Sequence, residues 1–148
     1  MYADWFVNFV VVAVTLGAVA LCVLTHYEGL VLTSRGLARH PAVHRHAKVL
    51  QGIASILALH VLEIWIFGVA AWALLKWPEC GSLSPAAPHL FDVIYFSAVT
   101  FTTVGYGDLA PLGPIRFLAG TEALSGFVLL TWSASFTYLE MERFWRRP

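Results

Sequence analysis

Three long apolar runs, separated by shorter polar segments, dominate the sequence. They extend over about residues 5–25, 49–75 and 115–139. Each is long enough for an α-helix to cross the hydrocarbon core of a bilayer, which takes about 20 residues. The pattern therefore predicts an all-α membrane protein with three transmembrane helices. A signal peptide is the competing interpretation of the first run, but it needs a basic start, and Asp4 is the only charge before that run.

A fourth apolar run, Leu90–Phe101, is too short to cross a membrane. It predicts a re-entrant helix that enters the bilayer and returns on the same side. Asp92 falls in its first turn, where a carboxylate suits the positive end of a helix. The preceding residues 76–89 contain three prolines and Gly81, which predicts an exposed loop.

The composition supports a location in lipid. The 148 residues are 59% hydrophobic and only 12% charged, against about 25% charged residues in ordinary soluble domains. Nine basic and nine acidic residues cancel, so no net charge indicates nucleic acid as a partner. The first apolar run has no periodic arginines, and we do not expect a voltage-sensing helix there.

The segment after the short helix, residues 102–108, reads Thr-Thr-Val-Gly-Tyr-Gly-Asp. Gly105 and Gly107 lack a Cβ atom and adopt left-handed backbone conformations at little cost. Val104 and Tyr106 are expected to point outward and anchor the loop. Four such loops around an axis would stack rings of carbonyl oxygens that replace the water around a potassium ion. Irregular backbone of this kind must be walled by protein inside the membrane.

The sequence Thr-Val-Gly-Tyr-Gly-Asp resembles the selectivity-filter signature of potassium channels at every position. Similarity to the pore unit of that family covers roughly residues 49–142. The resemblance implies a potassium-channel pore fold in a four-fold symmetric homotetramer. It also implies passive potassium conduction without catalysis or a cofactor. The K+ sites are then formed by Thr103, Val104, Gly105 and Tyr106.

The apolar runs and the resemblance together divide the chain into three parts. These are an N-terminal transmembrane helix (residues 1–28), a cytoplasmic basic and histidine-rich linker (29–48) and a pore domain (49–148). The pore domain is expected to contain, in order, an outer helix (49–75), an outer loop (76–89), a pore helix (90–101), the filter (102–108), an inner helix (115–139) and a short cytoplasmic tail (140–148).

The resemblance places Tyr95 and Phe96 where an aromatic pair on the pore helix braces the filter. The Tyr95 hydroxyl either donates a hydrogen bond to Asp108, as in some members, or packs without that bond. Val99 stands where some bacterial members carry a glutamate, so a glutamate–aspartate pair behind the filter is not available to this chain. The residues expected to support the filter are Thr102, Gly107, Asp108, Tyr95, Phe96 and Glu122.

Gly126 matches the position of the hinge glycine on the inner helix of the family. Glycine inside a helix costs about 1 kcal/mol relative to alanine, so either a bend or close packing between helices would explain it.

Leu130, Ala134 and Tyr138 follow at a spacing of four and share one helix face. By analogy this face lines the cavity below the filter; the alternative is that it packs against neighbouring spans.

Two carboxylates, Glu63 and Glu122, fall inside predicted spans. A carboxylate at the centre of a span costs about 2.5–3.5 kcal/mol, so each should find a partner or stay protonated. His60 lies three residues from Glu63 on the same face, and the two can satisfy each other. We expect Glu122 behind the pore helix, within reach of Ser97 or Thr100. There it either braces the filter or makes an ordinary interhelical hydrogen bond.

The predicted linker is rich in histidine and in basic residues. His40, His44 and His46 suggest a metal site by composition, but a pH-sensitive segment and an unspecialised linker are the simpler interpretations. The cations that could attract anionic lipid headgroups are Arg35, Arg39, Arg45 and Lys48.

The distribution of basic residues predicts the orientation in the cell membrane. Four lie in the first connection and three in the tail, whereas only Lys76 and Arg116 lie on the opposite side. The positive-inside rule then places the connection and the C-terminus in the cytoplasm and the N-terminus outside. Cys80 falls on the outer side, where it remains a free thiol or forms a disulfide between subunits.

Other classes of membrane protein share some of these sequence features. A subunit of a potassium uptake transporter has related pore loops, but such proteins usually carry four degenerate repeats, whereas this chain has a single complete motif. A non-conducting auxiliary subunit is also compatible with the sequence. A membrane enzyme using His60, Glu63 and Glu122 would lack a nucleophile–base pair and a metal signature. The sequence does not predict the gating stimulus.

Overall fold

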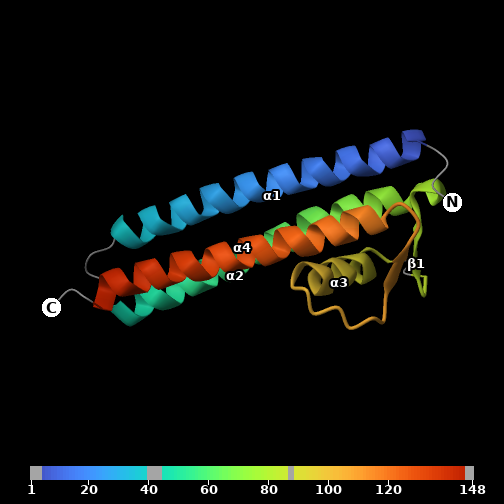
Figure 1. The fold of residues 1–148 in the computed structure, drawn as a ribbon. Helices are drawn as coiled ribbons and strands as arrows, with labels where there is room; N and C mark the ends of the chain where they lie inside the picture. Colours follow the sequence, from blue (N-terminus) through green and yellow to red (C-terminus); the bar gives the residue numbers. More distant parts are fainter. Residues whose placement is uncertain (1–4, 40–44, 87–88, 146–148) are drawn as a thin grey trace.

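Three long helices run side by side along the molecule (Figure 1). The computed structural model describes residues 5–39, 45–86 and 89–145. The long helices are α1 (Trp5–Arg39), α2 (Arg45–Leu75) and α4 (Arg116–Trp145). All three are apolar and long enough to cross a membrane, which confirms the predicted number of spans and the predicted helical class.

The short helix α3 (Leu90–Phe101) lies beside α2 and α4 near one end of the bundle (Figure 1). Its bounds are those predicted for the pore helix, and it is too short to span. It enters the bundle next to α2 and is followed by an irregular loop that returns to α4. The arrangement is that of a re-entrant helix held between two membrane-spanning helices.

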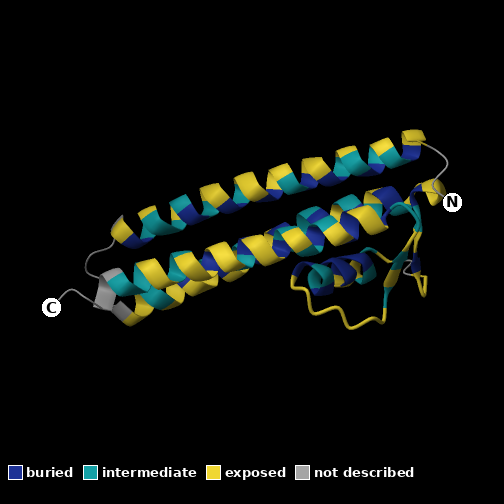
Figure 2. Ribbon diagram, in the orientation of Figure 1, coloured by how far each residue is buried: buried dark blue, intermediate teal, exposed yellow. Residues whose placement is uncertain are grey.

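Burial follows the helix faces (Figure 2). The largest fully buried apolar side chains gather where α2, α3 and α4 meet, and they are Phe67, Phe101, Ile115, Leu118 and Leu129. On the outward faces, large apolar side chains such as Leu24, Leu57 and Phe127 are more than half exposed. An exposed surface this apolar is typical of helices that lie in lipid or against further protein.

The predicted linker over residues 29–48 needs correction, because most of it is helical. Helix α1 continues to Arg39 and α2 begins at Arg45, which leaves only residues 40–44 between them. Leu30 and Leu37, both buried, continue the inward face of α1 beyond the first apolar run. No proline precedes Pro41, so no residue with a fixed φ and a missing amide hydrogen interrupts the helix earlier. His40 and His44 lie outside the described residues.

The predicted outer loop, residues 76–89, contains two short elements that the all-α prediction missed. After the 3-10 helix η1 (Pro78–Cys80), strand β1 (Ser82–Ser84) pairs antiparallel with β2 (Ala110–Leu112). Gly81, which lies between η1 and β1, has φ of 124°, and a Cβ atom there would collide with the Leu112 carbonyl oxygen. The two strands pair the segment before α3 with the segment before α4, so they hold together the two ends of the stretch that contains α3 and the irregular loop.

Helix α4 begins at Arg116 and continues to Trp145, beyond the end predicted at residue 139. Its first turn is fixed by the Ile115 amide, which donates a 2.8 Å hydrogen bond to the Cys80 carbonyl. The predicted tail, residues 140–148, is therefore helical in its described part.

Candidate functional site

The irregular loop at residues 102–108 is positioned by α3. Helix α3 begins with a capping box, in which the His89 amide donates to Asp92 at 3.4 Å. At the other end, the Thr102 amide donates to Ala98 and the Thr103 amide to Thr100. The chain then leaves the helix without regular secondary structure. The negative end of the α3 dipole thus lies at the start of the loop.

The loop backbone takes left-handed conformations at every second residue. The φ angles are 60° at Thr103, 52° at Gly105 and 80° at Gly107. Such an alternation turns successive carbonyl groups toward one side of the chain, as a cation site made of backbone oxygens requires. For Thr103 a positive φ is unusual, because its side chain is branched at Cβ, and strain of this kind gathers at functional sites.

The loop is held to α3 but is otherwise uncovered. The Gly105 amide donates a 3.0 Å hydrogen bond to the Val99 carbonyl. All residues from 102 to 108 are exposed in the single chain, and Val104 and Tyr106 are 55% and 73% exposed. More than half of the surface of each predicted anchor is therefore uncovered in the single chain. An anchoring role for them requires further protein around the loop.

The far end of the loop is tied back to α3 through Tyr95. The Tyr95 hydroxyl donates a 2.7 Å hydrogen bond to Oδ2 of Asp108, and Oδ1 of Asp108 accepts from the Leu109 amide at 3.1 Å. Of the two arrangements left open by the sequence, the bonded one is present. The neighbouring Phe96 is buried in the core at 3% exposure. The aromatic pair thus contacts the loop on one side and the bundle on the other.

Glu122 lies behind α3, where the sequence predicted it. The Ser97 hydroxyl is within hydrogen-bonding distance of Oε1 of Glu122 and of the Ile64 carbonyl, the latter at 2.8 Å. Ser97 and Glu122 are both fully buried. The contact joins α2, α3 and α4 at one point directly behind the helix that carries the loop.

Gly126 allows α4 to approach the end of α3 closely. A Cβ atom at this position would collide with the carbonyl oxygen of Phe101. Helix α4 runs through Gly126 without interruption. The glycine is therefore required for close packing in this conformation. Further along α4, Leu130 is half-buried, whereas Ala134 and Tyr138 are exposed.

A second polar cluster joins α1 to α2. Glu63 accepts hydrogen bonds from Nδ1 of His60 and from Nδ1 of His26, each at 2.8 Å. The His60–Glu63 contact was predicted from their spacing, but the participation of His26 was missed. His26 is the first residue after the predicted first span and its partner is 37 residues away, so only the helix pairing brings them together.

The structure places the predicted lipid-binding cations and Cys80 in different environments. Arg35 is exposed and Lys48 half-buried, while the side chains of Arg39 and Arg45 lie outside the described part of the chain. Cys80 is fully buried and free, and burial raises the pKa of its thiol. A buried thiol does not suit the disulfide between subunits that the sequence left open.

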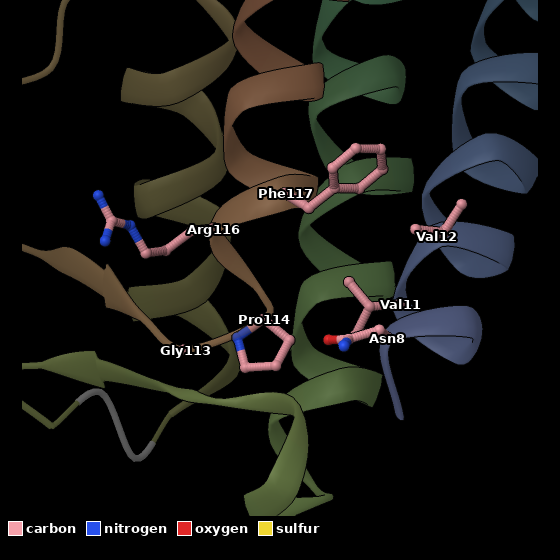
Figure 3. A pocket seen from close by; sticks show the side chains of 7 residues that line it. All are labelled: Asn8, Val11, Val12, Gly113, Pro114, Arg116 and Phe117. Atoms are coloured by element: carbon pink, nitrogen blue, oxygen red, sulfur yellow. The ribbon is translucent and has the colours of Figure 1, made fainter. Parts of the chain in front are cut away.

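A cavity of about 320 Å³ lies between α1 and the start of α4. In Figure 3, Phe117 and Val12 face each other across it, while Arg116 points away. The side chains and backbone that line it are Asn8, Val11, Val12, Gly113, Pro114, Arg116 and Phe117. None of these belongs to the loop at 102–108, so the cavity is separate from the candidate ion site.

Comparison with known proteins identifies the region that contains α3 and the loop. A family model described as an ion channel matches residues 59–141, more than half of the chain. The inward rectifier potassium channel Kirbac3.1 of Paramagnetospirillum magnetotacticum is 35% identical over 94 residues, which are 62% of this chain and 30% of that protein. A voltage-gated potassium channel of Aeropyrum pernix is 34% identical over 67 residues, 45% of this chain and 22% of that protein.

A third relative, the two-pore potassium channel 4 of Arabidopsis thaliana, is 40% identical over 58 residues, 38% of this chain and 19% of that protein. The chain spans less than a third of the length of each of these relatives. No solved structure matches it significantly. The re-entrant helix, the loop and the three spanning helices agree with these matches. The chain therefore belongs to the ion channel family: it is a multi-pass membrane channel protein with a pore domain of the potassium-channel type, and it is not an enzyme.

Proposed function

We propose that the chain forms a homotetrameric channel that conducts potassium selectively and passively. The observation that carries the proposal is the loop at 102–108, left-handed at every second residue and exposed throughout in one chain. Irregular backbone is tolerated at membrane depth only where protein or a water-filled cavity surrounds it. Because each chain contributes one loop, further copies of the chain are the simplest source of that wall.

Four loops around one axis would supply rings of oxygens for a dehydrated K+ ion. The carbonyls of Thr103, Val104, Gly105 and Tyr106 form these rings, with the Thr103 hydroxyl at the lower end. Val104 and Tyr106, exposed in the single chain, then pack against α3 helices or loops of neighbouring copies. The negative ends of four α3 helices face the ion below the filter and favour a cation there.

The rest of the pore follows from the same arrangement. Leu130, Ala134 and Tyr138 on α4 line the cavity below the filter, and Gly126 serves as the point where α4 bends on opening. Glu122 and Ser97 brace α3 from behind. The N-terminus lies outside and the C-terminus in the cytoplasm, where the basic residues after the first span contact anionic lipid.

Reconstitution of the purified chain by itself tests the proposal. In liposomes loaded with K+, we expect an ion flux that is much smaller when Na+ replaces K+, and native mass spectrometry should give a mass of four chains. A tight complex that carries no flux would instead indicate an auxiliary subunit. Equal K+ and Na+ fluxes, or a monomer, would reject the channel proposed here.

Two glycine variants distinguish an effect specific to the loop from a general effect of replacing glycine by alanine. Gly105→Ala places a side chain on a backbone with φ of 52°, so it should abolish or strongly reduce K+ selectivity. Gly36→Ala in α1 is the matched control, because a Cβ atom there has nothing within 4 Å. The control should assemble and conduct like the parent chain.

A further inference from the structure

The cluster of His26, His60 and Glu63, hereafter the His–Glu–His cluster, has no role in the ion path described above. Each imidazole donates from Nδ1 to a different oxygen of the one carboxylate, both at 2.8 Å. The exposed fractions are 0% for His26, 8% for His60 and 0% for Glu63. Three groups of the kind that bind metals therefore meet inside the membrane-spanning part of the bundle.

One nitrogen of each ring is left over. Nε2 of His26 and Nε2 of His60 are buried and have no hydrogen-bond partner among the described residues. Aromatic rings lie beside both histidines: the centre of the His26 ring is 5.1 Å from that of Trp132, at an interplanar angle of 49°, and the centre of the His60 ring is 6.1 Å from that of Phe101. Buried nitrogens without partners are uncommon in folded proteins, so the hydrogen bonds to Glu63 do not satisfy the cluster completely.

The geometry fits a transition metal. One ligand atom from each residue of the cluster lies within 4.8 Å of the other two. At a tetrahedral Zn2+ with bonds of about 2.0–2.1 Å, nitrogen and oxygen ligands lie roughly 3.3 Å apart. Each Nδ1 now lies 2.8 Å from its own carboxylate oxygen, so an ion bound through the two Nδ1 atoms requires each of these contacts to open by about half an ångström. Two imidazoles and a carboxylate also match zinc better than Mg2+ or Ca2+, which prefer oxygen ligands.

The cluster is also built across helices. His26 comes from α1, whereas His60 and Glu63 come from α2. Trp132, which His26 contacts, belongs to α4. An ion held here would therefore connect α1, which lies outside the matched family region at 59–141, to the helices of the pore domain.

We propose that His26, His60 and Glu63 bind one divalent transition-metal ion per chain, of the Zn2+ class, and that this ion fastens α1 to the pore domain. The three residues leave a fourth position on the ion for water or another donor. The alternative is a cluster closed by protons alone, in which the carboxylate simply accepts two hydrogen bonds. The inference does not depend on which ion the pore conducts.

Metal binding to the purified full chain decides between the two. After removal of metals with a chelator, the chain is titrated with Co2+ as a spectroscopic probe and then with Zn2+ in competition. We expect one Co2+ per chain with the strong visible absorption of a four-coordinate site, displaced by Zn2+. A wild-type chain that gives no such spectrum and retains less than one Zn2+ would overturn the proposal, whatever the variants do.

Variants then assign the site. His26→Gln keeps a hydrogen-bond donor for Glu63 but removes the metal ligand, and we expect affinity to fall by at least about tenfold, the loss expected even for an outer-shell partner of a metal site. His46→Ala is the matched control, an exposed histidine at the start of α2. It should bind like wild type, with the helix content of both variants checked by circular dichroism. Unchanged binding in His26→Gln, or an equal loss in His46→Ala, would refute the assignment.

Discussion

The hydroxyl of Tyr95 and the carboxylate of Asp108, joined by a 2.7 Å hydrogen bond, connect the helix before the loop to the residue at its far end. Together with the bond from the Gly105 amide to the Val99 carbonyl, it fixes the loop to α3 at two points. Tyr95 is 39% exposed, so water competes for this bond. The bond is therefore a modest restraint on the loop rather than a rigid clamp.

Tyr95→Phe is expected to lower the open probability of the channel. It removes a hydrogen bond worth about 0.5–1.5 kcal/mol, roughly a two- to tenfold change in the equilibrium between conducting and non-conducting loops. Single-channel recording in planar bilayers measures this change directly. Tyr27→Phe on α1, an exposed tyrosine far along the sequence, is the control and should leave the open probability unchanged. An open probability in Tyr95→Phe equal to that of the control would mean that the bond does not bear on gating.

Gly126→Ala is expected to destabilise the protein, because the added Cβ atom meets the Phe101 carbonyl. Overpacking of this kind costs typically about 1–3 kcal/mol, and here it pushes α4 away from the end of α3. Gly120→Ala on the same helix has nothing within 4 Å of its Cβ and should be neutral or slightly stabilising, by up to about 1 kcal/mol. Thermal unfolding followed by circular dichroism compares the two. A similar midpoint for both variants would show that α4 accommodates the methyl group at no cost.

Ser97→Ala tests the contact behind α3. Removing the hydroxyl takes away the hydrogen-bond partner of the buried Glu122 carboxyl and should destabilise the protein by about 1–3 kcal/mol. Ser125→Ala is the matched control, since its hydroxyl bonds within its own helix, to the Thr121 carbonyl at 2.8 Å. The free energy of unfolding of the two variants is the readout. Stability of Ser97→Ala equal to that of Ser125→Ala would mean that the contact does not restrain α3.

Glu122→Gln separates bracing of the loop from stability. Glutamine still bonds to Ser97, so the fold should persist, while the group can no longer gain or lose a proton. If Glu122 braces the filter, open probability and its response to pH should both change in bilayer recordings. Unchanged currents at every pH would leave Glu122 as an ordinary interhelical contact.

The pore region could be predicted well from sequence because its signals are local. The bounds of α3 follow from a short apolar run with Asp92 near its start, and the loop from closely spaced glycines. The end of α1 could not be predicted in the same way. An apolar run indicates which residues lie in the hydrocarbon core, but it does not show where the helix ends. Helix α1 continues beyond its apolar run because its backbone hydrogen bonds continue and because Leu30 and Leu37 are still buried against the bundle.

Other features depend on contacts between distant residues and carry no local signal. Strands β1 and β2 are three residues each, and β2 contains Pro111, which disfavours a strand assignment. Their pairing exists because the fold brings Ser84 opposite Ala110. Likewise, the spacing of His60 and Glu63 could be recognised on one helix, but the third member, His26, comes from another.

Cys80 gives the last prediction, which concerns the surface around the pore entrance. Its thiol is fully buried, and burial raises its pKa above the ordinary value. A raised pKa lowers the thiolate fraction at neutral pH, so labelling by a maleimide should be slow at pH 7 and should accelerate as the pH rises. In a Cys22→Ala background, a Ser82→Cys, Cys80→Ala variant provides an exposed thiol nearby and should label quickly at pH 7. Fast labelling of Cys80, or dimers linked through it on non-reducing gels, would show that this segment opens in the assembled protein.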